Sequence, residues 1–174
     1  CVQSPISSSS ARIAAMSYLV WKCLHIVSMV VFLGNIGTGL FWATQAHRAR
    51  DARLIAATFR SIERSDRWFT IPGVVGIVVS GTAMAMGGGF PILSTGWIVW
   101  PIGLFTLSGV VFGAWVAPLQ RRISREMEAA TSVEAAWNGY AGLYRRWELW
   151  GLLSLLTPFA SALIMILKPA LPGL

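Results

Sequence analysis

Long apolar stretches separated by shorter polar ones dominate the chain and predict four membrane-spanning helices. The apolar stretches cover about residues 18–46, 68–86, 97–117 and 147–167. At about 1.5 Å per residue, each is long enough as a helix to cross a hydrocarbon core of about 30 Å. The alternating segments of about ten residues that form membrane β-barrels are not seen. We therefore expect an all-α fold, an integral membrane four-helix bundle formed by residues 17–174.

The composition agrees with a membrane protein rather than a water-soluble domain. Of the 174 residues 55% are hydrophobic and only 12% are charged, whereas soluble domains carry about 25% charged residues. In the first apolar stretch Trp21 and Trp42 lie about 31 Å apart along a helix. Indole rings favour the headgroup region, so this spacing fits one ring at each membrane surface.

The basic residues gather in two of the three loops. The first loop holds six, Arg48, Arg50, Arg53, Arg60, Arg64 and Arg67, and the third holds five, Arg121, Arg122, Arg125, Arg145 and Arg146. Eleven of the fourteen lysines and arginines therefore lie on one side, which the positive-inside rule makes cytoplasmic. We expect a multi-pass protein of the bacterial inner membrane with both termini in the periplasm. Because the net charge of +7 is split between two loops, it does not indicate nucleic-acid binding.

The two basic loops have helical periodicity and predict cytoplasmic helical extensions. Apolar residues recur at helical spacing in both, as Leu54, Ile55, Phe59 and Ile62, and as Ile123, Met127, Ala130, Val133, Trp137, Tyr140 and Tyr144. The simpler interpretation is that the first and third spans continue as amphipathic helices. The functional alternative is a docking surface for a partner or for anionic lipid. Thr131 and Glu134 have capping-box spacing, which predicts two helical pieces in the third loop. We expect His47, at the start of the first loop, to be solvated.

Residues 1–16 are rich in serine and predict a flexible segment. Two interpretations of the first residue stay open. Cys1 followed by a serine-rich tether is typical of a mature lipoprotein, lipidated at that cysteine, and an external N-terminus agrees with this. In the other interpretation, Met16 is the true start and the preceding residues are not native.

An ionisable side chain lies within the first apolar stretch. His25 shares a helix face with Ser28 and Asn35, and Lys22 lies close to one turn before it. Ionisable groups inside a bilayer are costly and are therefore candidate functional residues. Imidazole is a common axial ligand of haem, but a lone histidine in a membrane helix also hydrogen-bonds to neighbouring helices. His25 is thus either a metal or haem ligand or a structural hydrogen-bond partner.

Other candidate ligands lie toward the same membrane surface. Lys168 ends the fourth span, so Lys22 and Lys168 are candidate cofactor-binding residues, and the simpler interpretation makes them anchors at the interface. Met84 and Met86, near the outer end of the second span, are candidate soft ligands for Cu(I) or an axial haem sulfur.

Small residues predict close helix packing. Gly73, Gly76 and Ser80 lie on the second span, and Gly109 and Gly113 form a GxxxG motif on the third. Small side chains let helix backbones approach each other in membranes. We therefore expect a tight bundle at both positions.

Several short motifs resemble a bacterial family of small, predicted four-helix integral membrane proteins of unknown function. They are Lys22-Cys23-Leu24-His25-Ile26, Ala46-His47-Arg48, Asp66-Arg67-Trp68-Phe69-Thr70-Ile71-Pro72 and Lys168-Pro169. The opening Trp21-Lys22-x-Leu24-His25 and closing Lys168-Pro169 also resemble, more distantly, HemJ-type protoporphyrinogen oxidases and CopD-type copper-resistance membrane proteins. The HemJ likeness implies b-type haem, with His25 as its ligand and Lys168 as a site residue.

Two functions of different classes follow. The sequence shows no nucleophile–base pair, phosphate loop or acidic pair, which favours a non-catalytic accessory or structural subunit of a larger bacterial redox or energy-converting membrane complex. Its contacts would be the lipid bilayer and partner subunits. The alternative is a b-type haem-binding redox protein or HemJ-like oxidase with His25 as axial ligand. A copper or small-solute carrier is a third hypothesis.

Overall fold

The computed structural model describes residues 6–130 and 132–174, and every regular element in these ranges is helical. In chain order the elements are α1 (Ile6–Ala49), α2 (Ala52–Ser65), η1 (Asp66–Thr70), α3 (Ile71–Gly87), α4 (Gly96–Val111), η2 (Phe112–Val116), α5 (Ala117–Ala129) and α6 (Val133–Leu167). The short elements η1 and η2 are π-helical turns.

These elements join into four long rods. The π-turns connect α2 to α3 and α4 to α5 without a break, so the apolar rods cover Ala15–Ala49, Ala52–Gly87, Gly96–Ala129 and Ala136–Leu167. At 32 to 36 residues each, they measure roughly 50 Å at the rise of an α-helix, more than the hydrocarbon core requires. The predicted four-helix membrane bundle is confirmed, and each rod is long enough to project beyond the bilayer.

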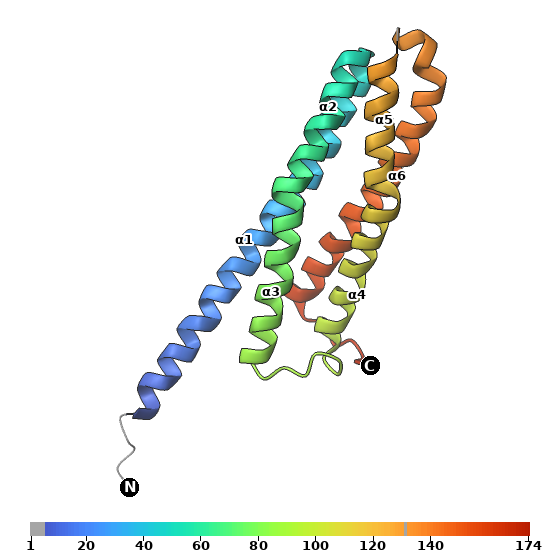
Figure 1. The fold of residues 1–174 in the computed structure, drawn as a ribbon. Helices are drawn as coiled ribbons and strands as arrows, with labels where there is room; N and C mark the ends of the chain where they lie inside the picture. The colour runs from blue at the N-terminus through green and yellow to red at the C-terminus, as the bar shows by residue number, and fades with distance from the viewer. Residues whose placement is uncertain (1–5, 131) are drawn as a thin grey trace.

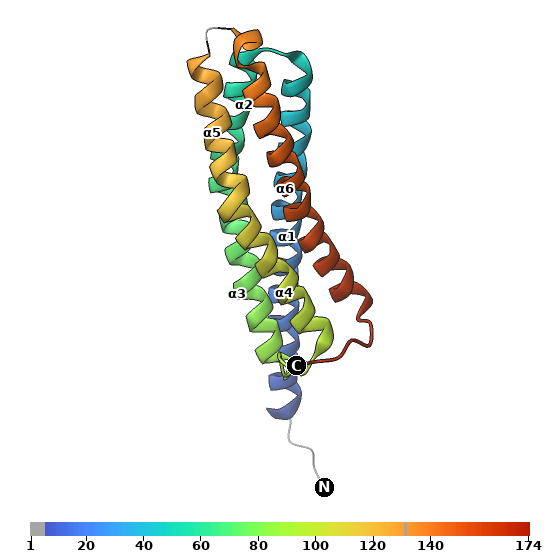
Figure 2. The ribbon, with the colours of Figure 1, turned by 90° about the vertical axis from the view of Figure 1, so that its right-hand side faces the viewer.

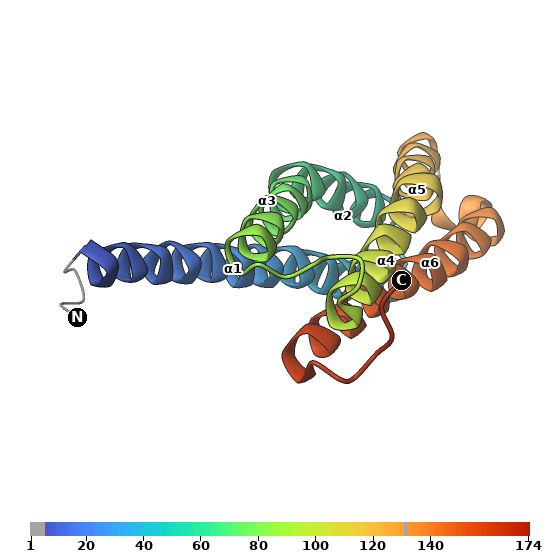
Figure 3. The same ribbon diagram turned by 90° about the horizontal axis from the view of Figure 1, so that it is seen from below.

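The two ends of the bundle differ (Figure 1). At one end lie the α1–α2 and α5–α6 connections with the arginine clusters of residues 48–67 and 121–146, and we name it the arginine-rich end. The start of α1, the α3–α4 connection and the C-terminus lie at the other, the terminal end. There α1 packs beside α3, and α4 packs beside α6 (Figures 2 and 3).

The main hydrophobic core sits at the arginine-rich end. It is built from α2 and α5 against the ends of α1 and α6, and its largest buried members include Phe59, Tyr140 and Trp147. The rings of Phe59 and Trp147 meet edge to face, with centroids 4.9 Å apart. Burial of apolar side chains stabilises helix packing when those side chains would otherwise contact water. Between helices surrounded by hydrocarbon this stabilisation is absent. This explains why the amphipathic segments, and not the spans, carry the dense core.

Each π-turn comes just before a proline that lies within a continuous rod. Pro72 and Pro118 are the second residues of α3 and α5. A proline inside a helix removes one backbone hydrogen bond and its ring clashes with the carbonyl four residues earlier. The wider π-turn accommodates this, since the Ile71 N–H bonds to the Asp66 carbonyl five residues before it. The turn also carries Asp66 and Thr70 into the interior, where both are buried.

The structure corrects one detail of the predicted extensions. The helix in the first loop continues the second span rather than the first, because α1 ends at Ala49 and Arg50 adopts a left-handed φ of 51°. Asp51 then caps α2, and its Oδ1 accepts hydrogen bonds from the backbone N–H of Arg53 at 2.8 Å and of Leu54 at 3.2 Å. The third span does continue as an amphipathic helix, α5.

The third loop contains two helical pieces, as predicted. Ala130 is extended and separates α5 from α6. Thr131, the predicted capping residue, lies outside the described residues.

Helix α1 begins earlier than the composition suggests. It starts at Ile6, so residues 6–16 are helical, while the flexibility of residues 1–16 stays a prediction. Alanine and arginine in this stretch are strong helix formers and extend the helix backward from the first span. Cys1, the predicted lipidation site, lies outside the described residues.

Replacing Phe59 tests the location of the core. Phe59 is fully buried, so Phe59→Ala should lower the free energy of unfolding by about 3–5 kcal/mol. Leu54, on the same helix, is 46% exposed, and Leu54→Ala should change it by no more than about 0.5 kcal/mol. Titration of the purified protein in mild detergent with a denaturing detergent measures both. Equal losses for the two variants would show that the core lies elsewhere.

Candidate functional site

A cavity of about 430 Å³ opens inside the terminal end, and all four rods line it. The larger or polar lining side chains are Tyr18, Lys22, His25 and Met29 of α1, Met84 of α3, Phe90 of the connection, Trp97 of α4, Met165 of α6, and Lys168 just after α6. Pockets that hold cofactors have volumes of about 300–1,000 Å³ and mostly apolar walls with a few polar groups. This cavity, which we name the terminal cavity, has both properties. It brings His25, Lys22, Met84 and Lys168 together.

His25 is held in a defined orientation at the wall of the terminal cavity. The side chain is 8% exposed, and its Nδ1 lies 3.1 Å from the Ile77 carbonyl and 3.1 Å from Ser80 Oγ. A carbonyl oxygen can only accept a hydrogen bond, so Nδ1 carries the proton in the neutral ring. Nε2 then keeps its lone pair. No hydrogen bond to Nε2 comes from the described residues.

Small residues on α3 make room for this arrangement. A Cβ at Gly73 would lie 3.1 Å from Phe32 Cβ, one at Gly76 would collide with Ser28 Oγ, and one at Gly81 would lie 3.2 Å from the His25 ring. Ser80 is fully buried. The α1–α3 contact therefore uses small residues along one face of α3.

The GxxxG motif lies in a different environment. An added Cβ at Gly109 or Gly113 would meet nothing within 4 Å among the described residues. These two glycines do not bring α4 or η2 against another helix of this chain, because they face outward from the bundle.

Lys168 closes the terminal cavity beside Trp97. Its Nζ lies 4.7 Å from the centre of the Trp97 ring, a cation–π contact. Lys168 directly follows α6 and adopts a left-handed conformation with φ 45°. The chain after it then returns to the α3–α4 connection, where the Leu174 N–H donates to the Leu93 carbonyl at 2.8 Å. Trp100 Nε1, in the first turns of α4, donates to the Pro172 carbonyl at 3.1 Å.

Only one of the two methionines predicted as ligands lines the terminal cavity. Met84 lines the terminal cavity, but Met86 is 76% exposed and is absent from its walls. Met86 points away because it lies two residues from Met84, which turns it to another face of the helix. Met29 and Met165 take its place. Sequence reasoning missed both, since methionine in a membrane helix is an ordinary apolar residue.

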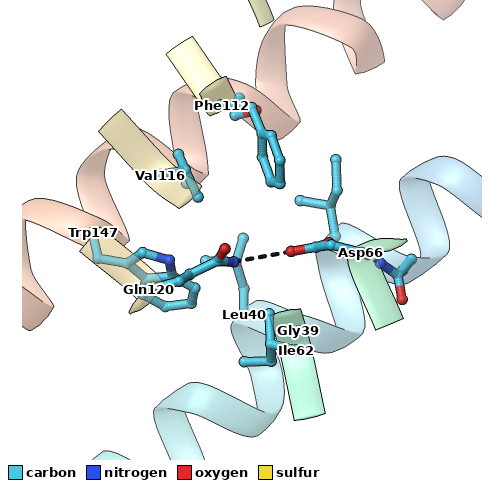
Figure 4. A pocket seen from close by; sticks show the side chains of 12 residues that line it. Gly39, Leu40, Ile62, Asp66, Phe112, Val116, Gln120 and Trp147 are labelled. Carbon is cyan, nitrogen blue, oxygen red and sulfur yellow. Dashed lines mark hydrogen bonds between the residues drawn. The ribbon is translucent and has the colours of Figure 1, made fainter. Parts of the chain in front are cut away.

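A second polar site lies in the interior nearer the arginine-rich end (Figure 4). The Asp66 carboxylate accepts three side-chain hydrogen bonds. Asn35 Nδ2 at 3.1 Å and Thr70 Oγ1 at 2.9 Å donate to Oδ1, and Gln120 Nε2 at 3.1 Å donates to Oδ2, the bond drawn in Figure 4. Asp66 is 8% exposed and Gln120 is 3% exposed. A small cavity of about 20 Å³ adjoins both residues and Trp147. We name these four residues, Asn35, Asp66, Thr70 and Gln120, the Asp66 cluster.

Few sequence features predict the Asp66 cluster. Asp66 stands among arginines and Gln120 precedes Arg121 and Arg122, so both read as water-facing residues of basic loops. The usable signal is the placement of Asp66 and Thr70 four residues apart, immediately before Pro72. Buried polar side chains are bonded to partners in nearly all structures, and this cluster links α1, η1 and α5.

His47, predicted to be solvated, is only partly exposed. Its ring stacks on Tyr144, with centroids 4.0 Å apart and planes 8° apart, and its Nδ1 lies 3.1 Å from the Tyr140 hydroxyl. Trp137 stacks on it as well, at 5.2 Å. The second helical piece of the third loop brings these aromatic rings over the end of α1.

The comparison with protein families decides what kind of protein this is. A family model described as a predicted integral membrane protein matches residues 19–169. The chain belongs to the DUF2269 family. The resemblance seen in the sequence is thereby confirmed, and the part of this DUF2269 protein that matches the model contains His25, the Asp66 cluster and Lys168. No curated protein and no solved structure matches the chain. The distant likeness to HemJ-type and CopD-type proteins therefore remains an expectation from short motifs.

Removing one donor from the Asp66 carboxylate should destabilise the DUF2269 bundle. Gln120→Leu keeps a similar volume and leaves Asp66 Oδ2 without its side-chain donor, so we expect a loss of about 1–3 kcal/mol in the free energy of unfolding. Gln45 is exposed, and Gln45→Leu is the matched control, with no loss expected. Thermal unfolding in mild detergent compares the two variants. An unchanged Gln120→Leu protein would show that the Asp66–Gln120 bond does not stabilise the fold.

Proposed function

We propose that this DUF2269 protein binds a b-type haem in the terminal cavity, with His25 as axial ligand. The observation that carries the proposal is the His25 imidazole, which is oriented by a hydrogen bond through one of its two ring nitrogens. Nδ1 donates to the Ile77 carbonyl of α3, which leaves the Nε2 lone pair for a ligand. Histidines that ligate metals almost always donate their other ring N–H to such an acceptor.

The donor set of the cavity suits a haem better than a bare metal ion. In the described residues no three side chains of histidine, cysteine, aspartate or glutamate converge on one point. A bare zinc or copper ion needs several protein ligands, whereas haem iron takes four from the porphyrin and one or two from the protein. Met84, Met29 and Met165 line the same cavity as His25, and a thioether is a known second axial ligand of haem.

Two lysines lie where the acidic groups of a haem would need partners. Lys22 and Lys168 both line the terminal cavity, and two ammonium groups match the two carboxylates of haem b. A haem bound there supplies one-electron redox chemistry. The residues of the chain orient it, pair with its carboxylates and surround it with apolar side chains.

The arginines support an orientation for the whole molecule. We place the arginine-rich end in the cytoplasm and the terminal end at the periplasmic face of a bacterial inner membrane, because eleven of the fourteen basic residues lie at the former. The terminal cavity then opens toward the outer leaflet. A redox group at that level could exchange electrons with partners at the periplasmic face.

Haem titration with histidine variants tests the proposal. Purified protein in mild detergent is titrated with haemin, and reduced-minus-oxidised spectra are recorded. We expect a Soret shift with α and β bands for the wild type. His25→Ala should weaken haemin binding by more than about 100-fold, because loss of even an outer partner of a ligand costs about 10- to 100-fold.

The other histidine of the chain is the matched control. His47 lies at the arginine-rich end in the aromatic stack, so His47→Ala should leave the haemin spectrum unchanged. A folded wild-type protein that binds no haemin would contradict the proposal, and so would equal binding by wild type and His25→Ala.

A second function is favoured by the outward-facing glycines. Gly109 and Gly113 have open space above them, and such positions let a helix of another subunit approach closely. A non-catalytic accessory subunit of a larger redox or energy-converting membrane complex would present this face to its partner.

Double substitution of the glycines tests this second function. Gly109→Leu with Gly113→Leu should abolish migration in an assembly larger than the 18.9 kDa chain on native gels of gently solubilised membranes. Gly139→Leu, on α6 and also open above its Cα, should not. A wild-type protein that migrates alone would exclude the accessory role.

A further inference from the structure

A lateral groove near the arginine-rich end lies between α6 on one side and η2 with α5 on the other. Helices α5 and α6 run side by side there (Figure 2). The groove has a volume of about 490 Å³, and it is lined by Ala114, Trp115, Pro118, Leu119, Arg122, Arg146 and Trp150. Neither the terminal cavity nor the Asp66 cluster shares any of these residues. We name it the lateral groove.

The lateral groove has an apolar floor and a cationic rim. Trp115 and Trp150 stack with centroids 4.9 Å apart and planes 20° apart, and Pro118 and Leu119 continue the apolar surface. Arg122 and Arg146 add two guanidinium groups. A ligand that fits must combine an apolar part with a negative charge.

The two parts lie at different depths along the rods. Trp150 stands at the start of the apolar stretch of α6, and Arg146 precedes it by four residues, about 6 Å along a helix. On the neighbouring rod, Arg122 follows Trp115 by seven residues, about 10 Å. Indole rings settle at the membrane interface, so both guanidinium groups lie beyond it, where the phosphates of a bilayer are found.

The guanidinium groups keep donors for an anion. Arg122 Nε donates to Glu126 Oε1 at 2.7 Å, which orients the side chain and leaves its terminal N–H groups. Arg146 is exposed and forms no ion pair within the described residues. Arginine N–H groups bind phosphate oxygens in paired hydrogen bonds.

We propose that the lateral groove binds an anionic phospholipid. Its phosphate lies between Arg146 and Arg122, and its glycerol ester region and the start of an acyl chain lie against Trp115 and Trp150. Basic pockets between membrane helices on the cytoplasmic side are a recurrent form of headgroup recognition. An acidic peptide would not use the indole floor, because that surface lies at the depth of lipid esters.

Native mass spectrometry of the purified full chain in mild detergent tests the proposal. The protein is titrated with dioleoyl-phosphatidylglycerol or with dioleoyl-phosphatidylcholine. We expect retained phosphatidylglycerol at a several-fold lower concentration than phosphatidylcholine. Arg146→Gln should weaken phosphatidylglycerol binding by about five-fold, the effect of one basic residue at an anionic surface. Adding Arg122→Gln should weaken it further by a similar factor.

The neighbouring arginine gives a matched control. Arg145 is exposed and carries the same charge, but it does not line the lateral groove, so Arg145→Gln should leave phosphatidylglycerol binding within two-fold of wild type. Trp150→Leu should weaken binding of the lipid, and a thermal unfolding curve confirms that each variant is folded.

Three outcomes would overturn the proposal. The first is equal binding of phosphatidylglycerol and phosphatidylcholine. The second is an equal loss for Arg145→Gln and Arg146→Gln, which would indicate a diffuse charge effect. The third is displacement of phosphatidylglycerol by inorganic phosphate at the same concentration, which would make the groove a simple anion site without a role for its apolar floor.

Discussion

Hydrocarbon cannot hydrogen-bond to a peptide group, and this constraint shapes the whole molecule. Inside a bilayer each backbone N–H and C=O needs a partner within the chain, so the spans are helices. An apolar side chain also gains no hydrophobic free energy by moving from hydrocarbon into the bundle interior. The large aromatic and aliphatic core, with Phe59 and Trp147, therefore forms at the arginine-rich end, where the rods project toward water. At the terminal end, polar contacts and small residues hold the rods together. The interior of that end contains the terminal cavity.

Specific polar contacts join the rods within the membrane. His25 bonds from α1 to α3, and Ser108 Oγ donates to the Ser154 carbonyl from α4 to α6 at 2.7 Å. The Gln120–Asp66 bond connects these two helix pairs. A polar side chain in hydrocarbon has few alternative partners, so a small number of such bonds can fix the register of long helices. Because polar partners are scarce in hydrocarbon, it is significant that His25 hydrogen-bonds through Nδ1 while its Nε2 has no hydrogen bond from the described residues.

The features of the fold that depend on contact with lipid or water, namely the spans and their ends, could be predicted from the sequence. The long apolar stretches predicted the four spans, and the tryptophan spacing and arginine clusters indicated where the lipid region ends. Contacts between distant segments could not be predicted in this way. His47 and Gln120 both stand in strongly basic stretches of sequence. The partial burial of His47 and the full burial of Gln120 depend on how α5 and α6 pack against α1 and η1. The boundary between α1 and α2 depends on one left-handed residue, Arg50, and on the carboxylate of Asp51, which the hydrophobic period does not encode.

The return of the chain after α6 couples the mouth of the terminal cavity to the membrane surface. Lys168 stands between the end of α6 and the segment whose Leu174 N–H bonds to the Leu93 carbonyl and whose Pro172 carbonyl bonds to Trp100, so its backbone position depends on both. A displacement of this segment would therefore shift the cation that contacts Trp97 at the wall of the terminal cavity, so the shape and charge of the cavity wall follow from how the C-terminal residues dock.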